Sequence, residues 1–528
     1  MMRNRIISIV WVLMIGLGAM AQGAYVVPSN LKATGYAAHV ELTWVNHPAF
    51  VYQIYAAPAG SDEFVLRGET NSDYYFDFVS APDQPQSLIY RVLPKGMPVN
   101  SPEASRFEIQ AATRTYSDDQ LLNMVQQYTT RYFFENAEPV SKMARERSNS
   151  WDGPIVTTGG TGFGIMALIA GAERDYFSDS TLIAYLQDMV AFLSRIERFH
   201  GAWAHWYNAA TGQPFSFSKY DDGGDLVETA FLVQGLLTAR QWLLQQASPE
   251  AIELASRIQT LWEGVEWSWY TQGGQATLYW HWSKNFGWKM NHPIRGFDET
   301  MITYVLAASS PTYPIKPEVY HKGYTNSKVF LNGKSYYGIK LPLGMDYGGP
   351  LFFTHYSFLG LNPNGLKDQY ANYLERNTAH AMIHYLYAVD NPKLHIGLSD
   401  KSWGFTSSDD PLVGYTSHHP GTNDENGTIS PTAAISSIVY TPNESMKAIR
   451  YFYYELGPIL FNKYGFYDAY NLGMVEGQQV VHSYLAIDQG PIAVMIENYR
   501  SKLLWNLFMS NKEVQTGLTR LGFKYQVP

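Results

Sequence analysis

The chain falls into two parts that differ in the spacing of their hydrophobic residues. Between Tyr25 and about Thr113, apolar and polar residues alternate in short runs separated by Pro, Gly, Asn and Asp. Such alternation predicts strands that bury one face. The runs are Val40–Trp44, Val51–Tyr55, Tyr74–Phe78, Leu88–Val92 and Arg106–Gln110. Residues 25–113 are therefore predicted to form a small all-β sandwich.

From Thr115 onward the hydrophobic spacing is that of helices. The predicted helices are Ser117–Glu135, an apolar helix opened by a glycine-rich turn within Thr157–Arg174, Ser180–Phe199, Leu226–Gln246, Pro249–Trp267, Asp298–Ser309, Leu366–Val389, Ser430–Ile438, Asn443–Leu456 and His482–Ser510, with a break near Gly490. Very apolar helices alternate with amphipathic ones, which indicates an inner and an outer ring. Residues 116–528 are predicted to form an all-α (α/α)6 barrel. The alternative is a superhelical solenoid, which is disfavoured because the sequence has no repeating unit.

The first residues have the pattern of a secretory signal peptide. Arg3 and Arg5 precede the apolar run Ile6–Gly18, and small residues follow at Ala19 and Ala21. The run is shorter than the ~20 residues that a membrane span needs, so we expect cleavage after Ala21 and a periplasmic or secreted protein. The chain contains no Cys, which excludes disulfides, thiol nucleophiles, Cys-ligated metals and lipid attachment to a cysteine.

Composition narrows the class of ligand. The net charge is −9 and the pI is about 5.9, which disfavours nucleic acid and anionic membranes because both require basic patches. Aromatic residues make up 15% of the chain, with 14 Trp and 39 Tyr. Aromatic rings stack on the C–H faces of sugars, so we expect an oligosaccharide or polysaccharide partner. A monomer is the default expectation for the oligomeric state.

A first acidic cluster lies where a very apolar helix begins. Asp221 and Asp225 precede Leu226, and Gly223 and Gly224 between them allow a close approach of the backbone. Asp225 also has the position of a helix N-cap, with Glu228 three residues later as in a capping box. The acids therefore have a catalytic interpretation and a structural one, of which we favour the catalytic.

A second acidic pair, Asp298 and Glu299, also precedes an apolar helix and follows a tryptophan-rich segment. A carboxyl group among aromatic rings has its pKa raised by loss of solvation, so one of the two is the best candidate for a general acid. The residues expected to bind sugar are Trp203, Trp206, Trp280, Trp282, Trp288, His292, Arg295, His355, Trp403 and Tyr415. Asp488, in the apolar segment Tyr484–Ile492, is a further catalytic candidate.

Trp403 and Tyr415 belong to a long segment, Ser399–Pro431, which is too rich in Trp, Tyr, His and Asp for a simple connection. No cofactor and no metal are expected. The His380–His384 pair lacks the glutamate of a zinc-peptidase motif, and the glycine-rich segment Thr157–Arg174 lacks the spacing of a nucleotide loop. No nucleophile elbow of the G-x-S-x-G type is present.

These motifs resemble glycoside hydrolase family 144, whose members act on β-1,2-glucan and are described as glucoamylase-like. The resemblance covers roughly residues 116–525 and is carried by TGGTGFG (158–164), DDGGDLVET (221–229), LYWHWS (278–283), RGFDE (295–299), YVLAASSPT (304–312), YGGPLFFTHYSFLG (347–360) and LAIDQGPI (485–492). It implies an (α/α)6 catalytic domain and inverting hydrolysis without a metal. The acidic positions of the family fall on Asp221, Asp225, Glu299 and Asp488. RGFDE departs from the family pattern at Phe297 and Asp298, which leaves Glu299 as the constant acid.

The β part is similar to a fibronectin type III module, a resemblance carried by Pro28, Leu31, Trp44, the Tyr52–Tyr55 run and Tyr90–Val92. It contains no cluster of acids, so a spacer or accessory role is expected, with sugar binding as the alternative. For the whole chain the sequence predicts an inverting β-1,2-glucan hydrolase, acting endo or releasing sophorose. The alternatives are a glycan-binding protein without activity and a polysaccharide lyase on the same fold.

Overall fold

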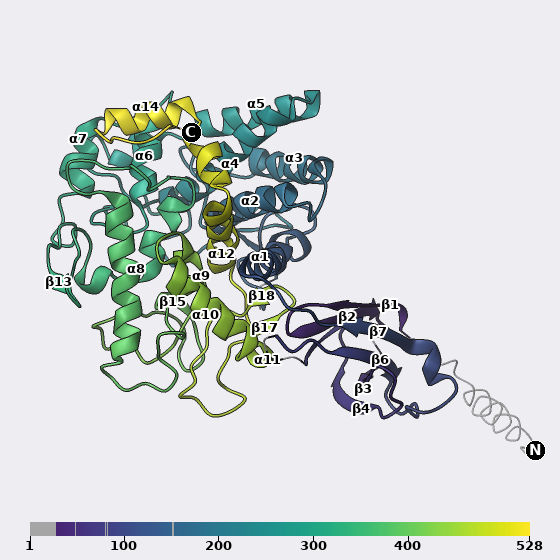
Figure 1. Ribbon diagram of the computed structural model, residues 1–528. Coiled ribbons are helices and arrows are strands. Elements are labelled where there is room, and N and C mark those ends of the chain that lie inside the picture. The colour runs from purple at the N-terminus through teal and green to yellow at the C-terminus, as the bar shows by residue number, and fades with distance from the viewer. Residues whose placement is uncertain (1–27, 48, 80, 82, 150–152, 528) are drawn as a thin grey trace, which may run out of the picture. The chain divides into compact units, whose positions relative to one another are not determined.

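The computed structural model describes residues 28–47, 49–79, 81, 83–149 and 153–527, so the expected signal peptide lies outside the described residues. The chain divides into two compact units, Met1–Ser117 and Asp118–Pro528. The first unit is built from strands and the second mainly from helices (Figure 1). Among the described residues, no helix has both the length and the apolar character needed to cross a membrane.

The first unit consists of two antiparallel sheets with strand orders β1-β2-β5 and β4-β3-β6-β7. The strands are β1 (Ser29–Gly35), β2 (His39–Val45), β3 (Tyr52–Pro58), β4 (Val65–Thr70), β5 (Tyr74–Phe78), β6 (Ser87–Pro94) and β7 (Glu108–Ala112). Inward residues of both sheets, such as Leu42, Trp44, Ile54 and Val92, form one buried core. The pattern predicted five of the strands. It did not predict β1 and β4, because their residues remain largely exposed and show no apolar alternation.

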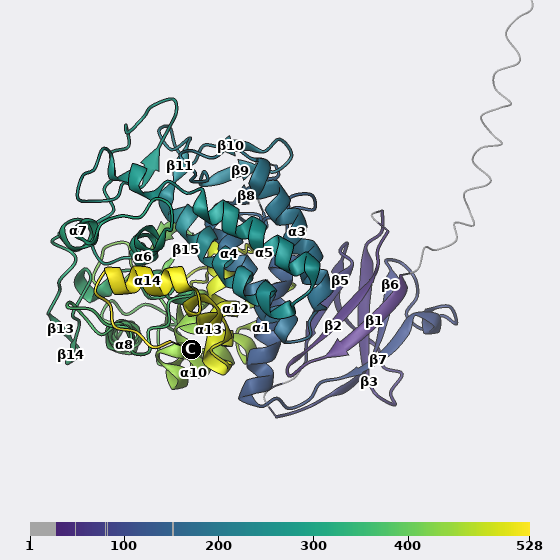
Figure 2. The ribbon, with the colours of Figure 1, turned by 90° about the horizontal axis from the view of Figure 1, so that it is seen from above.

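The second unit contains a series of helices joined by segments of very different length (Figures 1 and 2). They are α1 (Asp118–Glu135), α2 (Thr158–Glu173), α3 (Asp179–Arg195), α4 (Leu226–Gln246), α5 (Pro249–Glu263), α6 (Met301–Ser309), α7 (Pro317–Val319), α8 (Tyr373–Asp390), α9 (Pro431–Ser436), α10 (Pro442–Tyr454), α11 (Gly457–Leu460), α12 (Ala486–Arg500), α13 (Leu503–Met509) and α14 (Lys512–Arg520). The C-terminal helix α14 lies beside α6, from the middle of the chain.

The helices differ in how much of their surface is buried. Nearly every side chain of α2, α4, α6, α9 and α12 is buried. By contrast, α3, α5, α10 and α14 bury one face and expose the other. Because α2 packs against both α4 and α12, and α12 against α9, the apolar helices form the interior of the unit. The alternation in the sequence thus reports which helices are internal.

Two predicted helix boundaries are wrong. Residues 366–372 are not helical, because α8 begins at Tyr373, where the Asn372 side chain accepts hydrogen bonds from the amides of Leu374 and Glu375. The expected break at Gly490 does not occur, since α12 continues through Pro491. The helix instead ends at Arg500, and Lys502 takes a left-handed φ of 62° before α13 begins.

Short strands between the helices position the candidate site. They include the sheet β10-β9-β8, formed by β8 (Ile155–Thr157), β9 (Trp206–Asn208) and β10 (Gln213–Phe215), the pair β11 (Gly224–Asp225) and β12 (His281–Trp282), and the hairpin β15 (Ser407–Asp410) and β16 (Gly414–Ser417). The described residues also contain two further short strand pairs, β13 (Ser335–Tyr336) with β14 (Ile339–Lys340) and β17 (Phe461–Asn462) with β18 (Gly465–Phe466). The β15–β16 hairpin gives the predicted loop Ser399–Pro431 a fixed structure.

Candidate active site

A cavity of about 370 Å³ opens in the helical unit beside β8, β9 and the first turn of α4. Its lining combines aromatic residues with five acidic or basic side chains. The aromatic residues are Trp206, Phe217, Phe231, Trp280, Phe352, Tyr356 and Tyr415, the titratable residues are Glu146, Arg147, His205, Glu228 and Glu299, and the remainder are Thr157, Leu485 and Ile487. Aromatic walls around a few carboxyl groups suit a neutral, hydroxyl-rich ligand.

Glu299 is the only one of the four predicted catalytic acids that lines the cavity. It immediately precedes α6, and its backbone is fixed because the Ser357 hydroxyl donates a hydrogen bond to the Glu299 carbonyl oxygen. Burial, and next the negative charge of Asp298, raise the pKa of the Glu299 carboxyl group well above its ordinary value. Glu299 therefore holds a proton under conditions in which an exposed glutamate has lost it.

Asp298 has a different role from its neighbour. Its Oδ1 accepts a hydrogen bond of 2.9 Å from the Thr300 amide and another from the Thr300 hydroxyl, which organises the turn leading into α6. Burial raises the pKa of Asp298 to about 6, although the bonds from Thr300 act in the opposite direction. Asp298 therefore organises the turn that holds Glu299 at the cavity.

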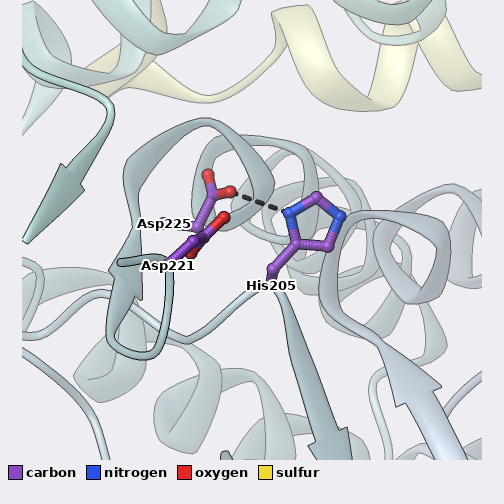
Figure 3. A group of neighbouring side chains, drawn as sticks. All are labelled: His205, Asp221 and Asp225. Carbon is purple, nitrogen blue, oxygen red and sulfur yellow. Dashed lines mark hydrogen bonds and ion pairs between the residues drawn. The ribbon is translucent and has the colours of Figure 1, made fainter. Parts of the chain in front are cut away.

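Asp225 is the N-cap of α4 and is completely buried. Its Oδ1 accepts hydrogen bonds from the amides of Val227 (3.0 Å) and Glu228 (2.9 Å), as the capping interpretation predicted. Its Oδ2 lies 3.0 Å from His205 Nδ1 (Figure 3). Burial by itself raises the pKa of Asp225, but the hydrogen bonds from His205 and His281 hold it well below the ordinary value. Asp225 is thus a permanently ionised, fully engaged carboxylate.

His281 joins the two aspartates of the first acidic cluster. Its Nε2 lies 3.0 Å from Asp221 Oδ2 and 3.4 Å from Asp225 Oδ2. Burial disfavours the charged ring, but the two carboxylates outweigh it and raise the pKa of His281 to about 10. Burial opposes the charge on His205 as well, yet Glu228 and Asp225 raise the pKa of His205 to about 9. Both imidazoles are therefore cations at neutral pH.

Sequence analysis predicted only a capping role for Glu228, yet this residue lines the cavity. Its Oε2 accepts a hydrogen bond of 2.8 Å from the Gly159 amide at the start of α2. Burial, together with the charges of Asp225 and Asp221, raises the pKa of Glu228 to about 7, against the influence of His205. Glu228 follows Asp225 by three residues, which places both on the same side of the first turn of α4. This spacing could have indicated from the sequence that Glu228 belongs to the site.

Glu146 and Arg147 are a second pair that sequence reasoning missed. Arg147 donates to both carboxylate oxygens of Asp409 (3.0 and 3.1 Å) and to Glu146 Oε2 (2.6 Å). Asp409 is further held by the Ser483 hydroxyl at 2.6 Å. This network connects β15 to the cavity wall. No sequence motif indicates it, because Arg147, Asp409 and Ser483 lie far apart in the chain.

Asp488 lies beside the cavity but is not among its lining residues, which include its neighbours Leu485 and Ile487. The side chain is buried, 2% exposed, in the first turn of α12. Burial, and next the charge of Asp468, raise the pKa of Asp488 well above its ordinary value. Asp488 therefore does not line the cavity in this conformation, and its raised pKa favours the protonated carboxyl group.

The predicted sugar-binding residues separate into three groups. Trp206, Trp280 and Tyr415 line the cavity. Trp203, His355 and Trp403 were wrongly expected to contact sugar, because each is buried in the core with 2% of its surface exposed or less. Trp203 instead donates to the Leu193 carbonyl and Trp403 to the Glu444 carbonyl. Apolar packing and sugar stacking select the same residue type, so the sequence could not separate them.

The third group lies near the cavity without lining it. His292 stacks on Trp280 with a centroid distance of 5.2 Å, so it supports a ring of the cavity wall. Arg295 is exposed. Trp282 and Trp288 belong to a separate aromatic cluster around Trp269, with centroid distances of 6.2 and 6.4 Å from that ring.

His205, Asp221 and Asp225 bring one potential metal-ligand atom each within 4.8 Å of one another (Figure 3). Two carboxylates and an imidazole are a common donor set for divalent cations. In this structure the cluster is an ion-paired network, because His205 Nδ1 lies 3.0 Å from Asp225 Oδ2 and His281 Nε2 lies 3.0 Å from Asp221 Oδ2.

Several known proteins are similar to this chain in sequence and in fold. The family described as "Putative glucoamylase" matches residues 291–512. The chain is 38% identical over 517 residues to the exo β-1,2-glucooligosaccharide sophorohydrolase (non-reducing end) of Parabacteroides distasonis, covering 94% of this chain and 70% of that protein.

Two crystal structures are similar as well. A β-1,2-glucanase from Parabacteroides distasonis has a TM-score of 0.85 and 37% identity, covering 95% of this chain and 73% of that one. An endo-β-1,2-glucanase from Chitinophaga pinensis, in complex with sophorotriose and glucose, has a TM-score of 0.75 and 47% identity, covering 78% of this chain and 99% of that one. The fold and cavity thus define a helical protein of the glycosidase-like class. Within that class, the chain belongs to the glucoamylase-like family.

Proposed function

We propose that this protein is an inverting glycoside hydrolase that cleaves β-1,2-linked glucans or their oligosaccharides. The observation that carries the proposal is the carboxyl group of Glu299, which lines an aromatic cavity and retains its proton because burial raises its pKa. A retained proton at a sugar-sized site is what a general acid for glycosidic cleavage requires. The relatives named above, which are a sophorohydrolase and two β-1,2-glucanases, support the linkage.

The finer assignments belong to the same proposal. The helical unit is an (α/α)6 barrel of glycoside hydrolase family 144, and the β unit is a fibronectin type III-like accessory module. We also propose a cleaved signal peptide over residues 1–21, a periplasmic or secreted location and a monomeric state. The alternation of buried and amphipathic helices along the chain supports the barrel, and the two sheets of the first unit support the accessory module.

In the proposed reaction, the glucan lies across the cavity with sugar rings against Trp206, Trp280 and Tyr415. Glu299 donates its proton to the departing glycosidic oxygen, and water attacks the anomeric carbon from the opposite face. The carbon is thereby inverted from β to α. An acid and a base that invert directly stand roughly 6.5–9.5 Å apart, which leaves room for the water.

Asp221, Asp225 and Asp488 remain the proposed candidates for activating that water. Asp225 is ionised but both of its oxygens are engaged, whereas Asp488 must lose a proton and gain access to the cavity before it can act. Glu228 joins the candidates because it touches the cavity directly and its pKa is raised to about 7. A base must be ionised, so its protonation sets the acidic limb of the activity profile.

The base can be identified from the pH dependence of kcat/KM in four isosteric variants, Asp221→Asn, Asp225→Asn, Glu228→Gln and Asp488→Asn. Removing the base abolishes the acidic limb and most of the rate, while removing a positioning group lowers the rate and keeps the limb. Circular dichroism of each variant controls for folding. If all four keep the limb, the water is activated by none of these groups.

The function itself is tested by incubating the protein with linear β-1,2-glucan, β-1,3-glucan and starch while recording anomeric proton signals by NMR. The expected result is an α-anomer that appears first and only from the β-1,2 polymer. Release of disaccharide indicates exo action, and mixed oligomers indicate endo action. Binding without cleavage would favour a glycan-binding protein, and an unsaturated product would favour a lyase; either result contradicts the proposal.

A further inference from the structure

A second aromatic cluster lies in the helical unit outside the cavity. Four residues, His200, Trp269, Trp282 and Trp288, form this cluster, the Trp269 patch. The His200 ring stacks on Trp269 at 3.8 Å and 17°, and Trp282 meets His200 edge-on at 4.7 Å. Trp269 leaves 41% of its surface exposed. None of the four residues lines the cavity.

Core packing does not account for the exposure of Trp269. The short helix Trp267–Thr271 buries Trp267 and Tyr270 completely and turns the Trp269 ring outward between them. A large apolar ring in water is costly, since burying such a side chain contributes about 1.5–3 kcal/mol. An outward ring beside other aromatic rings therefore indicates a contact surface.

The patch is held rigidly in place. Glu266 Oε2 lies 2.9 Å from His200 Nδ1, which fixes the orientation of the imidazole against Trp269. The Trp269 amide donates to the Glu266 carbonyl at 2.9 Å, and the Tyr270 hydroxyl donates to the Phe199 carbonyl at 2.7 Å. Rings that are already ordered lose little conformational entropy when a ligand binds.

The patch is structurally continuous with the acidic cluster. In β12, His281 and Trp282 are consecutive, and consecutive side chains of a strand point to opposite faces. His281 reaches Asp221 and Asp225, whereas Trp282 reaches His200. The partner strand β11 pairs Gly224 with Trp282 and Asp225 with His281. One strand pair thus supports both the candidate active site and the patch.

We propose that the Trp269 patch is a second carbohydrate-binding surface, which holds a distant part of the same β-glucan chain while another part occupies the cavity. Equatorial hydroxyl groups leave both faces of a β-glucose ring lined with C–H groups, which stack on indole and imidazole rings. The exposed Lys289 lies in the same segment as Trp282 and Trp288 and offers a donor to sugar hydroxyls. The inference rests on the proposed function, which supplies the identity of the ligand.

The test compares a long and a short substrate in the variants Trp269→Ala and Trp269→Phe. For linear β-1,2-glucan, Trp269→Ala is expected to raise KM roughly tenfold, which is equivalent to about 1.4 kcal/mol, and to leave kcat unchanged, since the stacking contact is lost. Kinetics on the β-1,2-linked tetrasaccharide are expected to stay at the wild-type values. Trp269→Phe, which keeps a ring, is expected to recover most of the polymer affinity.

The matched control is Tyr499→Ala, which removes another exposed aromatic ring, 44% exposed, at the C-terminal end of α12. It is expected to leave both substrates unaffected. Equal changes on polymer and tetrasaccharide, or no change on either, would overturn the patch as a glucan surface.

Affinity electrophoresis in gels containing β-1,2-glucan separates this inference from the proposed function. A Glu299→Gln protein is expected to be retarded by the polymer, and adding Trp269→Ala is expected to reduce that retardation. Retardation that depends on Trp269 without turnover of any glucan by the wild type would leave the patch standing and refute the hydrolase. Turnover of β-1,2-glucan together with retardation that does not depend on Trp269 would support the hydrolase and refute the patch as a glucan-binding surface. The patch would then indicate a protein partner.

Discussion

Two acidic groups of this protein, Asp225 and Glu299, have their pKa values shifted in opposite directions, because each has different neighbours. Asp225 accepts hydrogen bonds from two amides and lies against two histidines, which keep its pKa low. Glu299 faces an aromatic cavity beside another acid, and its pKa is raised. The protein thus places a stable anion and a proton donor at one site, which is the division of labour that acid catalysis requires.

The first prediction concerns Glu299→Gln, which keeps the size of the side chain and removes the transferable proton. We expect kcat on β-1,2-glucan to fall by about 10²–10⁴-fold with an unchanged circular dichroism spectrum, as for the loss of a general acid. Initial-rate measurements of reducing ends test this. A rate close to that of the wild type would remove Glu299 from the mechanism.

The second prediction concerns the stability contributed by His281. Its pKa is about 10 in the folded protein and about 6.5 when unfolded. Because folding raises this pKa, the contribution is complete below about pH 6.5 and is lost as the pH rises toward 10. The free energy of unfolding of His281→Gln should therefore differ from that of the wild type by about 3 kcal/mol at pH 6 and by much less at pH 10.

Urea unfolding at several pH values measures this difference. His292→Gln is the matched control, since loss of solvation and the charge of His281 lower the pKa of His292, the opposite direction from His281. The free energy of unfolding of His292→Gln should not fall below that of the wild type only at acidic pH. A difference for His281→Gln that grows with pH would contradict the ion-pair assignment.

At the scale of elements, the contact between α2 and α4 brings two internal helices together at glycines. A Cβ atom on Gly162 would lie 2.1 Å from the Phe231 carbonyl oxygen, and one on Gly235 would lie 2.2 Å from the Gly162 carbonyl oxygen. Both obstacles are backbone atoms, so the helices could not accommodate a side chain without moving apart. Such movement would displace Gly159 from Glu228 and so disturb the cavity wall.

The third prediction is that Gly162→Ala lowers the free energy of unfolding by about 2 kcal/mol or more and reduces activity, as overpacked cores do. Gly171→Ala, on the same helix, is the control. There a Cβ would meet Thr130 Cγ2 at 2.9 Å and Phe177 Cζ at 3.0 Å, which are side-chain atoms that can move. Chemical denaturation and activity assays of both variants test this prediction. Equal losses of stability and activity in the two variants would contradict the explanation that backbone atoms leave no room for a side chain at Gly162.

At the scale of the whole molecule, the two units have separate cores. The strands of the first unit enclose their own hydrophobic cluster, and every residue that lines the candidate active site belongs to Asp118–Pro528. The substrate-contacting machinery is therefore contained within one unit of the chain.

The fourth prediction is that a protein comprising residues 118–528 folds and cleaves the β-1,2-linked tetrasaccharide with the kcat of the full chain. The reason is that all groups of the cavity are present and the helices supply their own core. Purification of the fragment and steady-state kinetics test it. A folded fragment without activity would show that the first unit takes part in catalysis.

The sequence by itself determined the type of each unit and the most informative acid. Local periodicity records which face of a strand or helix is buried, so the β unit, the internal helices and the N-cap at Asp225 could be predicted. An acid beside tryptophans at a helix start predicted that Asp298 or Glu299 is the general acid, and the family resemblance of RGFDE singled out Glu299. Strands with exposed side chains, such as β1 and β4, left no such record.

Only the tertiary structure decided which residues share the cavity. Glu146, Arg147, His205 and Glu228 come from separate segments, and their proximity depends on helix packing rather than on sequence spacing. The structure also separated Trp206 and Trp280 at the cavity from Trp203 and Trp403 in the core. The physical reason is that burial, charge neighbours and ring exposure are properties of three-dimensional surroundings, which residue type alone does not encode.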